Sequence, residues 1–271
     1  MRFLTARRRH PAARALVLVF ALLVMGALYS ALAPSSKSAA DTSTSQQVEE
    51  GRALFAVSCA SCHGLNGEGQ TEGSIQGPPL TGVGAAAVEF QVATGRMPMA
   101  RPGPQAQVKP SEFTEEETLA LAAYVASLGP GPAIPDPSDY DPKGLSEEDI
   151  ARGGELFRTN CSACHNFEGA GGALPNGKYA PPLFGVSNRH LFEAMLTGPQ
   201  QMPVFSNGVL TIDDKRAIIG YLNELHSQPS RGGLALGGLG PVSEGLWAWL
   251  AGLGVLVLFA IWIAAKGVKA R

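Results

Sequence analysis

Two stretches of the chain carry the residues best suited to chemistry, and both read C-x-x-C-H. They span residues 59–63 and 161–165 and contain all four cysteines of the sequence. This pattern is the attachment signal for a c-type haem, in which two thiols bond the porphyrin and the adjacent imidazole ligates the iron. On a helix, positions i, i+3 and i+4 share one face, so all three groups point at one flat macrocycle. We therefore expect two covalently bound haem c groups. The residues expected to hold them are Cys59, Cys62, His63, Cys161, Cys164 and His165.

A four-thiolate zinc site is the main competing interpretation of these cysteines. Such sites typically place their two cysteine pairs about 15–20 residues apart. Here the pairs lie about a hundred residues apart and each is followed by a histidine, which favours haem. Because no cysteine is left over, we expect neither a structural disulfide nor a spare reactive thiol.

Each iron needs a second axial ligand, and two methionines are the main candidates. Met97 and Met202 each precede a proline and follow a Thr-Gly pair. Met/His ligation raises the haem potential and leaves no open position for oxygen or peroxide, which favours electron transfer over catalysis at iron. Met99 is the alternative to Met97, because it aligns with Met202 when no insertion is allowed. His190 and His226 are weaker candidates, since an isolated histidine on a helix or loop is usually a surface residue.

The segments around the two motifs repeat one another. Residues 51–55 precede the first motif at the same distance as residues 153–157 precede the second, and both segments begin with glycine and end in Leu-Phe. Pro-Pro-Leu follows at 78–80 and again at 181–183. So many similarities in one order indicate duplication of a folding unit.

Capping-box patterns predict where the helices of each unit begin. The four N-terminal residues of these patterns are Thr44, Thr114, Ser146 and Thr211. Between the two units, residues 129–145 are rich in proline and predict a semi-rigid extended connector. The fold expected from these patterns is all-α, with domains at 45–128 and 146–228.

An apolar run over residues 15–33 follows five arginines near the N-terminus. It suits either the core of a signal peptide or a membrane-spanning helix, so residues 1–33 keep both interpretations. Residues 34–44 are rich in Ser, Ala and Thr and predict a flexible tether.

A second apolar run, over residues 245–265, is long enough to cross a bilayer once. A linker rich in Gly and Leu precedes it at 229–244, and a basic tail follows at 266–271. Positive charge favours the cytoplasmic side, so we expect a cell-membrane protein with a cytoplasmic C-terminus and its haem domains on the outer face.

Charge is unevenly distributed along the chain. Of its 21 basic side chains, eight lie within the first 14 and last six residues, so the remainder carries 13 basic against 23 acidic ones. Such a field attracts a basic partner surface and repels nucleic acid. We expect no nucleic-acid partner.

Each repeat resembles a class I cytochrome c domain, through its C-x-x-C-H motif, Pro-x-Leu segment, methionine loop and closing helix. The resemblance implies that the closing helix crosses the first one, with Gly51 and Phe55 meeting Tyr124 in the first repeat. It also implies that the carbonyls of Pro78 and Pro181 accept the free imidazole N–H of each haem-ligating histidine.

The whole arrangement resembles the dihaem cytochrome c subunit of the actinobacterial cytochrome bc1 complex, often called cytochrome cc. Whole stretches such as residues 62–67 and 94–99 carry this resemblance. It implies a subunit of a menaquinol:cytochrome c reductase, with a Rieske iron–sulfur protein and a cytochrome b subunit as partners. Electrons would pass from the Rieske centre through both haems to an aa3-type oxidase, with the first domain as the entry point. The chain itself would be an electron-transfer component with no catalytic residue.

Other functions place different demands on the chain. A dihaem subunit of a cbb3-type oxidase or of an alcohol dehydrogenase would use the same motifs beside different partner subunits. A dihaem peroxidase would need one five-coordinate haem, which the paired methionines argue against.

Overall fold

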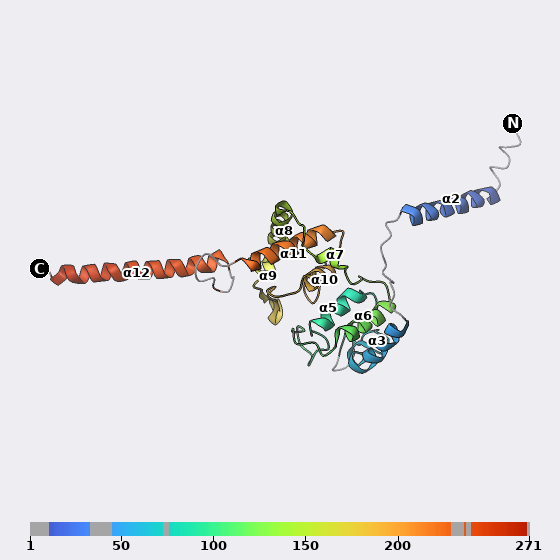
Figure 1. Ribbon diagram of the computed structural model, residues 1–271, viewed down its shortest axis with the longest axis horizontal. Helices are drawn as coiled ribbons and strands as arrows, with labels where there is room; N and C mark the ends of the chain where they lie inside the picture. The colour runs from blue at the N-terminus through green and yellow to red at the C-terminus, as the bar shows by residue number, and fades with distance from the viewer. Residues whose placement is uncertain (1–10, 33–44, 73–75, 229–235, 237–239, 270–271) are drawn as a thin grey trace, which may run out of the picture. The chain divides into compact units, whose positions relative to one another are not determined.

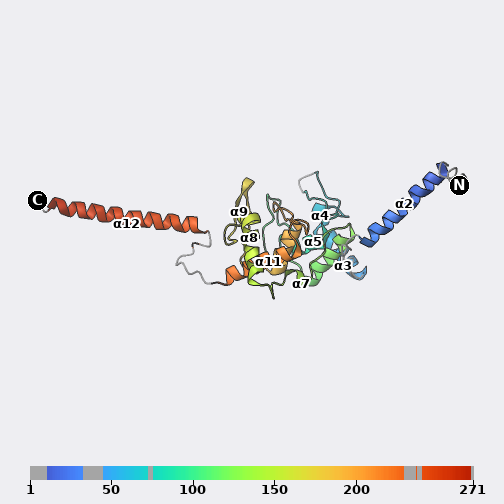
Figure 2. The same cartoon turned by 90° about the horizontal axis from the view of Figure 1, so that it is seen from above.

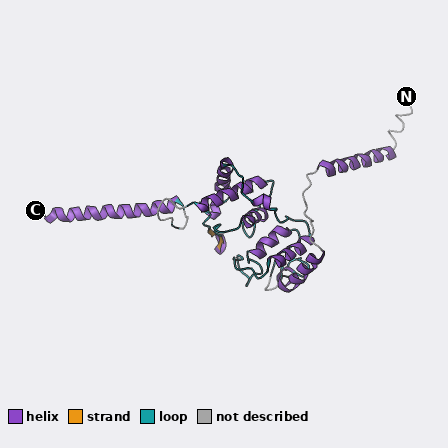
Figure 3. Ribbon diagram, in the orientation of Figure 1, coloured by secondary structure: helices purple, strands orange, loops and turns teal. Residues whose placement is uncertain are grey.

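The computed structural model describes residues 11–32, 45–72, 76–228, 236 and 240–269. It divides into two units, Met1–Thr42 and Ser43–Arg271. In the first unit the described part is one helix, α2 (Pro11–Leu32). Helices dominate the second unit as well, with one small hairpin (Figure 3). The predicted all-α class is confirmed.

The first repeat folds around two crossing helices. Its helices are α3 (Ser45–Ser58), α4 (Ala60–His63), α5 (Gly84–Ala93) and α6 (Glu115–Ser127). Helices α3 and α6 lie side by side (Figures 1 and 2). A Cβ atom at Gly51 would come within 1.9 Å of the Ala120 carbonyl oxygen, so only glycine allows this approach. The rings of Phe55 and Tyr124 pack 5.1 Å apart, which confirms the expected crossing.

The second repeat uses the same construction. Its helices are α8 (Glu147–Asn160), α9 (Ser162–His165), α10 (Asn188–Thr197) and α11 (Ile212–Ser227). Where α8 meets α11, a Cβ atom at Gly153 would come within 2.0 Å of the Ala217 carbonyl oxygen. The rings of Phe157 and Tyr221 pack 5.8 Å apart at this crossing.

Three of the predicted capping boxes are present. The hydroxyl oxygens of Thr114, Ser146 and Thr211 accept from the backbone N–H three residues on, at 3.2, 3.2 and 3.1 Å. Each bond satisfies one of the N–H groups that a helix start leaves unpaired. The fourth predicted cap, Thr44, lies outside the described residues.

Two short elements were not expected. The proline-rich connector contains one helical turn, α7 (Pro137–Tyr140), because Pro137 suits the first helical position and the Asp136 N–H donates to Asp139. The second repeat also contains an antiparallel hairpin, β1 (Gly172–Leu174) and β2 (Lys178–Ala180), joined by the turn η1 (Pro175–Gly177).

The C-terminal apolar run forms α12 (Pro241–Lys269). Within the described residues, its segment Val242–Gly267 is the one helix long and apolar enough to cross a membrane. The helix starts before the predicted residue 245, because Pro241 suits a helix start and the Ser243 hydroxyl donates to the Gly240 carbonyl at 2.8 Å. Most of the predicted linker 229–244 lies outside the described residues.

Candidate haem sites

Each C-x-x-C-H motif forms one helical turn that gathers its three functional side chains. In the first domain, the N–H groups of Cys62 and His63 both donate to the Cys59 carbonyl, at 3.1 and 3.0 Å. The second domain repeats this pattern. There Cys164 and His165 donate to the Cys161 carbonyl at 3.1 and 2.9 Å. None of the four cysteines forms a disulfide, so both pairs are available to bond a porphyrin.

Both histidines are buried and oriented by a proline carbonyl. Nδ1 of His63 lies 2.8 Å from the Pro78 oxygen, and Nδ1 of His165 lies 3.0 Å from the Pro181 oxygen. The carbonyl accepts the Nδ1–H, which leaves Nε2 of each ring to bind iron. This pairing confirms the prediction. Burial lowers the pKa of His165, although the bond to Pro181 opposes that shift, so the ring is neutral as iron ligation requires.

The first cysteine of each pair is a protonated thiol at neutral pH. Burial, assisted by the neighbouring Cys62, raises the pKa of Cys59 to about 11. Burial and Cys164 raise the pKa of Cys161 to the same value. A reactive redox cysteine has a lowered pKa, so this environment suits attachment of a prosthetic group better than thiol redox chemistry.

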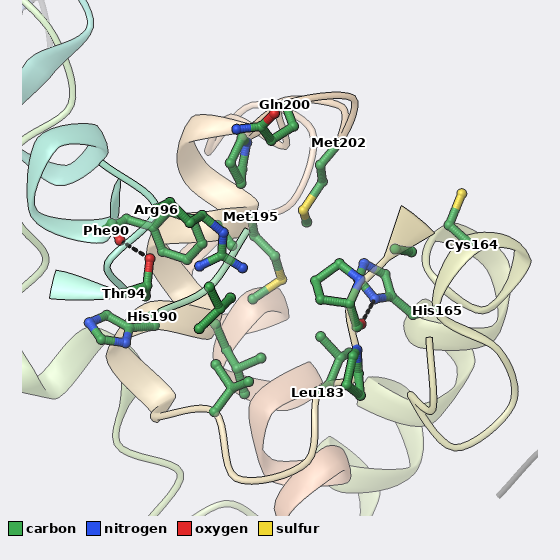
Figure 4. Close-up of a pocket in the computed structure, with 18 of the residues that line it drawn as sticks. Phe90, Thr94, Arg96, Cys164, His165, Leu183, His190, Met195, Gln200 and Met202 are labelled. Carbon is green, nitrogen blue, oxygen red and sulfur yellow. Dashed lines mark hydrogen bonds between the residues drawn. The ribbon is translucent and has the colours of Figure 1, made fainter. Parts of the chain in front are cut away.

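A cavity of about 730 Å³ opens beside the second motif. His165, Cys164 and Met202 line it (Figure 4), and so does Cys161. Its volume lies within the range of about 300–1,000 Å³ that cofactor pockets occupy. The imidazole, the two thiols and a thioether are the donors that a haem c requires. The residues present therefore fit that group.

Two methionines reach this cavity. Met202 was expected, but Met195 of α10 lines the same space and is buried (Figure 4). Sequence reasoning missed Met195, because a methionine on the buried face of a helix resembles core filler. Met202 lies on a loop, where its backbone N–H donates to the Pro199 carbonyl at 3.0 Å.

In the first domain, Met97 is the better-placed thioether. It packs against the core cluster that contains Phe55 and Leu121, and its N–H donates to the Gln91 carbonyl at 2.9 Å. Among the described residues, Met99 is not part of that cluster. Met97 stays the predicted ligand, with Met99 as the alternative.

The two remaining candidate histidines have other partners. Nε2 of His226 lies 2.8 Å from the Glu168 carbonyl, and its ring packs 4.3 Å from Phe184. His190 faces the first domain, where its Nε2 lies 3.6 Å from Glu89 and its ring meets Phe90 edge-on. Both contacts favour roles outside iron ligation.

A buried polar cluster joins the two domains, and sequence reasoning missed it. Arg189 of α10 contacts Glu89 of α5 at 3.0 Å and Glu193 at 3.3 Å. Burial and the nearby Glu89 raise the pKa of Glu193, so this carboxyl group is protonated at neutral pH. Burial alone would raise the pKa of Glu89 too, but His190, Glu193 and Arg189 outweigh it and lower that pKa. One arginine thus neutralises one carboxylate across the interface.

Comparison with known proteins shows which family this chain belongs to. The model "Cytochrome c" matches residues 48–129, and the model "Cytochrome C oxidase, cbb3-type, subunit III" matches residues 148–222. The cytochrome bc1 complex cytochrome c subunit of Corynebacterium diphtheriae is 44% identical, over 96% of this chain and 97% of that protein. The subunit of the same name from Mycobacterium tuberculosis is 44% identical, over 96% of this chain and 93% of that protein. The chain belongs to this family.

Membership in the cytochrome bc1 complex cytochrome c subunit family makes the chain a haem-carrying electron-transfer protein. Its cytochrome c domains imply covalently bound haem c, and α12 is its candidate membrane anchor. A solved structure of the Kuenenia stuttgartiensis reducing HAO-like protein complex aligns at 19% identity and a TM-score of 0.38, covering 65% of this chain and 96% of that one. That likeness is too weak to bear on the fold.

Proposed function

We propose that each domain holds one covalent haem c, so that the chain carries two. Cys59 and Cys62 attach the first haem, which His63 and Met97 ligate. The second haem is held by the corresponding residues Cys161, Cys164, His165 and Met202. The observation that carries this proposal is the repeated geometry: each motif ends in a buried histidine whose Nδ1 contacts a proline carbonyl. A bound haem supplies one-electron chemistry, and two axial ligands close the iron to substrates.

In this proposal the chain relays electrons within a menaquinol:cytochrome c reductase. The Rieske iron–sulfur protein would reduce the first haem, the second haem would accept from the first, and an aa3-type oxidase would accept from the second. A cytochrome b subunit completes the complex. The names of the relatives support membership of a bc1 complex. A membrane anchor keeps both haems near their partners and replaces diffusion by a high effective concentration.

The haem domains lie on the outer face of the cell membrane in this proposal, and the C-terminus is cytoplasmic. The tail is basic, and Nζ of Lys266 lies 4.5 Å from the ring centroid of Trp262. An aromatic ring beside a lysine at a helix end suits a membrane–water boundary. Labelling of a single cysteine added after Arg271 tests the topology: a membrane-impermeant reagent should leave it unmodified in intact cells.

Purification of the full chain from membranes tests the function. We expect two haem c per chain and co-purification of a cytochrome b, a Rieske protein and an aa3-type oxidase. A single haem would contradict the dihaem assignment. Isolation without cytochrome b and the Rieske protein would contradict the proposed complex.

Substitution of the methionines tests the axial ligands. Met97→Leu and Met202→Leu should each convert one haem to a form that binds carbon monoxide, whereas Met99→Leu and Met195→Leu should leave both haems closed. Carbon monoxide difference spectra measure this directly. Carbon monoxide binding in Met99→Leu, with none in Met97→Leu, would move the ligand to Met99.

The order of electron transfer has its own test. A chain without its first haem, made by Cys59→Ala with Cys62→Ala, should lose rapid reduction of the second haem by quinol. Stopped-flow absorbance measures the rate. Reduction of the second haem at the wild-type rate in this variant would reverse the proposed order.

The second candidate function is a dihaem subunit of a cbb3-type oxidase. The family model matching residues 148–222 favours it, because that model is named for such a subunit. It covers only the second domain, whereas the bc1 relatives match nearly the whole chain. Purification with a cbb3-type oxidase in place of cytochrome b would support this alternative.

A further inference from the structure

Arg96 belongs to the first domain but lines the cavity of the second. It follows α5 and directly precedes Met97, the proposed ligand of the first haem. Its side chain borders the space that His165 and Met202 also border (Figure 4). Arg96 and Met97 are therefore neighbours in one loop, but Arg96 borders the cavity of the second domain and Met97 packs against the core of the first.

The guanidinium of Arg96 has no carboxylate partner in the described part of the protein. Burial lowers the pKa of Arg96, and the nearby Tyr179 phenol opposes that shift. Cζ of Arg96 lies 4.6 Å from the ring centroid of Phe90. This aromatic ring covers one face of the guanidinium and supplies no negative charge. Neither a salt bridge nor a hydrogen bond joins the guanidinium to any described residue. Arginine stays charged in proteins, and a partly buried charge is costly without a counter-ion. We therefore expect the counter-ion of Arg96 to be an anion that the amino-acid chain does not itself provide.

The composition of the cavity wall points to the same conclusion. Its lining residues include the cations Arg96, Lys109 and Lys178 but neither aspartate nor glutamate. Lys109 is already paired with Glu112, which leaves Arg96 and Lys178 to meet an anion. The rest of the wall is largely apolar, so an anionic group here is held by few and well-placed charges.

Hydrogen bonds hold the loop of the first domain over this cavity. Nε2 of Gln105 donates to the Tyr179 carbonyl at 2.8 Å, and Oε1 of Gln105 accepts from the Tyr179 N–H at 2.9 Å. The Ala106 N–H also approaches Oε1 of Gln200 at 3.4 Å. These contacts attach the first domain to strand β2 and to the loop between α10 and α11 that carries Met202, and both segments border the cavity. Arg96 lies in the same loop of the first domain, lines this cavity and is held against the ring of Phe90.

We propose that the first domain completes the haem site of the second, with Arg96 as the cation that pairs with a haem propionate. This inference rests on the proposed function, because the anion is a propionate only when the second domain holds haem. The planar guanidinium can bind a carboxylate through two parallel hydrogen bonds, and the propionates are the carboxylates that a haem carries. A fixed positive charge beside the haem favours its reduced form. Arg96 therefore raises the reduction potential of the second haem, which favours electron transfer to it from the first.

Redox titration of the purified full-length complex tests this role. The variants are Arg96→Leu, Arg96→Lys and the matched control Arg101→Leu, which removes an exposed arginine from the same loop outside the cavity. The signal of the second haem is the one that changes in Met202→Leu. In Arg96→Leu we expect its reduced-to-oxidised ratio at a given potential to fall about tenfold, which is 59 mV for a one-electron couple. Arg96→Lys should retain most of the wild-type value.

Haem content separates the possible results. Loss of the second haem from Arg96→Leu alone, with two haems kept in Arg101→Leu, also supports the proposal. Equal potentials and two haems in Arg96→Leu and Arg101→Leu would overturn it. A wild-type chain whose second domain holds no haem would instead overturn the proposed function, and that result is visible before any variant is made.

Discussion

In the first domain Thr118 occupies the fourth position of the closing helix, and in the second domain Lys215 occupies that position. Thr118 donates its hydroxyl proton to the Thr114 carbonyl at 2.8 Å. Lys215 is fully buried and donates to Asn207 and to the Leu210 carbonyl, at 2.8 and 2.6 Å. Burial lowers the pKa of Lys215 to about 8, although the charge of Asp214 opposes the shift. The same helical frame thus carries a small hydroxyl in one copy and a buried amine in the other.

The two domains share positions that set the helix crossing, start the closing helix and orient the histidine. Both have a glycine at the helix crossing, a capping threonine on the closing helix and a proline carbonyl on the histidine. The side chains that pack around these shared positions differ between the two domains, because many side chains can fill a core of the same shape. The comparison therefore separates residues that build the site from residues that adapt each copy to its surroundings.

The largest expected effect concerns ion pairs that differ in burial. Arg189→Met removes the arginine that pairs with buried Glu89, leaves His190 at 3.6 Å as its nearest partner and should lower the free energy of unfolding by about 3–5 kcal/mol. The control, Arg52→Met, breaks a pair with Glu49 whose side chains are 63% and 70% exposed and should cost about 0–1 kcal/mol. Denaturant unfolding followed by circular dichroism measures both. Equal losses would show that burial does not distinguish the two pairs.

The glycines at the crossings should be equally intolerant of a side chain. Gly51→Ala and Gly153→Ala each force a Cβ atom onto a carbonyl oxygen, so each should cost about 1–3 kcal/mol or more. The controls are Gly103→Ala and Gly208→Ala, where a Cβ atom meets no heavy atom closer than 3.8 Å. Thermal unfolding of the haem-loaded chain measures the loss. A large effect in only one domain would refute the equivalence of the two crossings.

A smaller effect is expected at the helix caps. Thr114→Ala and Thr211→Ala each leave the N3 backbone N–H of a helix without its partner and should cost about 1 kcal/mol. Thr159→Ala is the control, because its hydroxyl bonds within a helix that is already formed. Hydrogen exchange at the first turns of α6 and α11 reports the change locally. Unaltered exchange in both variants would rule out a stabilising role for these caps.

The last expected effect is a change in the pH dependence of stability in the second domain. The folded-state pKa of Lys215, about 8, is below its ordinary value of 10.5. Between pH 8 and 10.5 the unfolded chain binds more protons at this lysine than the folded chain does. Lys215 therefore makes the free energy of unfolding increase as the pH rises through this range, and the contribution is lost as the pH falls through about 8. Lys215→Met should remove that rise, whereas Thr118→Val in the first domain should leave it unchanged. Unfolding midpoints measured from pH 7.5 to 10 compare the variants. A rise that persists in Lys215→Met would assign it to another group.

Features of this protein that depend on short spacings can be predicted from the amino-acid sequence. One helical turn sets the relation of Cys59, Cys62 and His63, and a capping box needs only four consecutive residues. Twenty apolar residues in a row predict α12 without reference to any other segment. Repetition of the motifs then predicts two domains of one kind.

Contacts between the two domains could not be predicted from the sequence and are visible only in the folded protein. Arg189 contacts Glu89 across a hundred positions of sequence, and Arg96 borders the cavity beside His165. Neither pairing follows from periodicity or spacing, because both depend on how two separately folded units pack together. The hairpin β1–β2 escaped prediction for a related reason, since strands of three residues carry too little periodicity to recognise. Motifs made of neighbouring residues can be recognised in the sequence, whereas contacts between domains form only after both domains have folded.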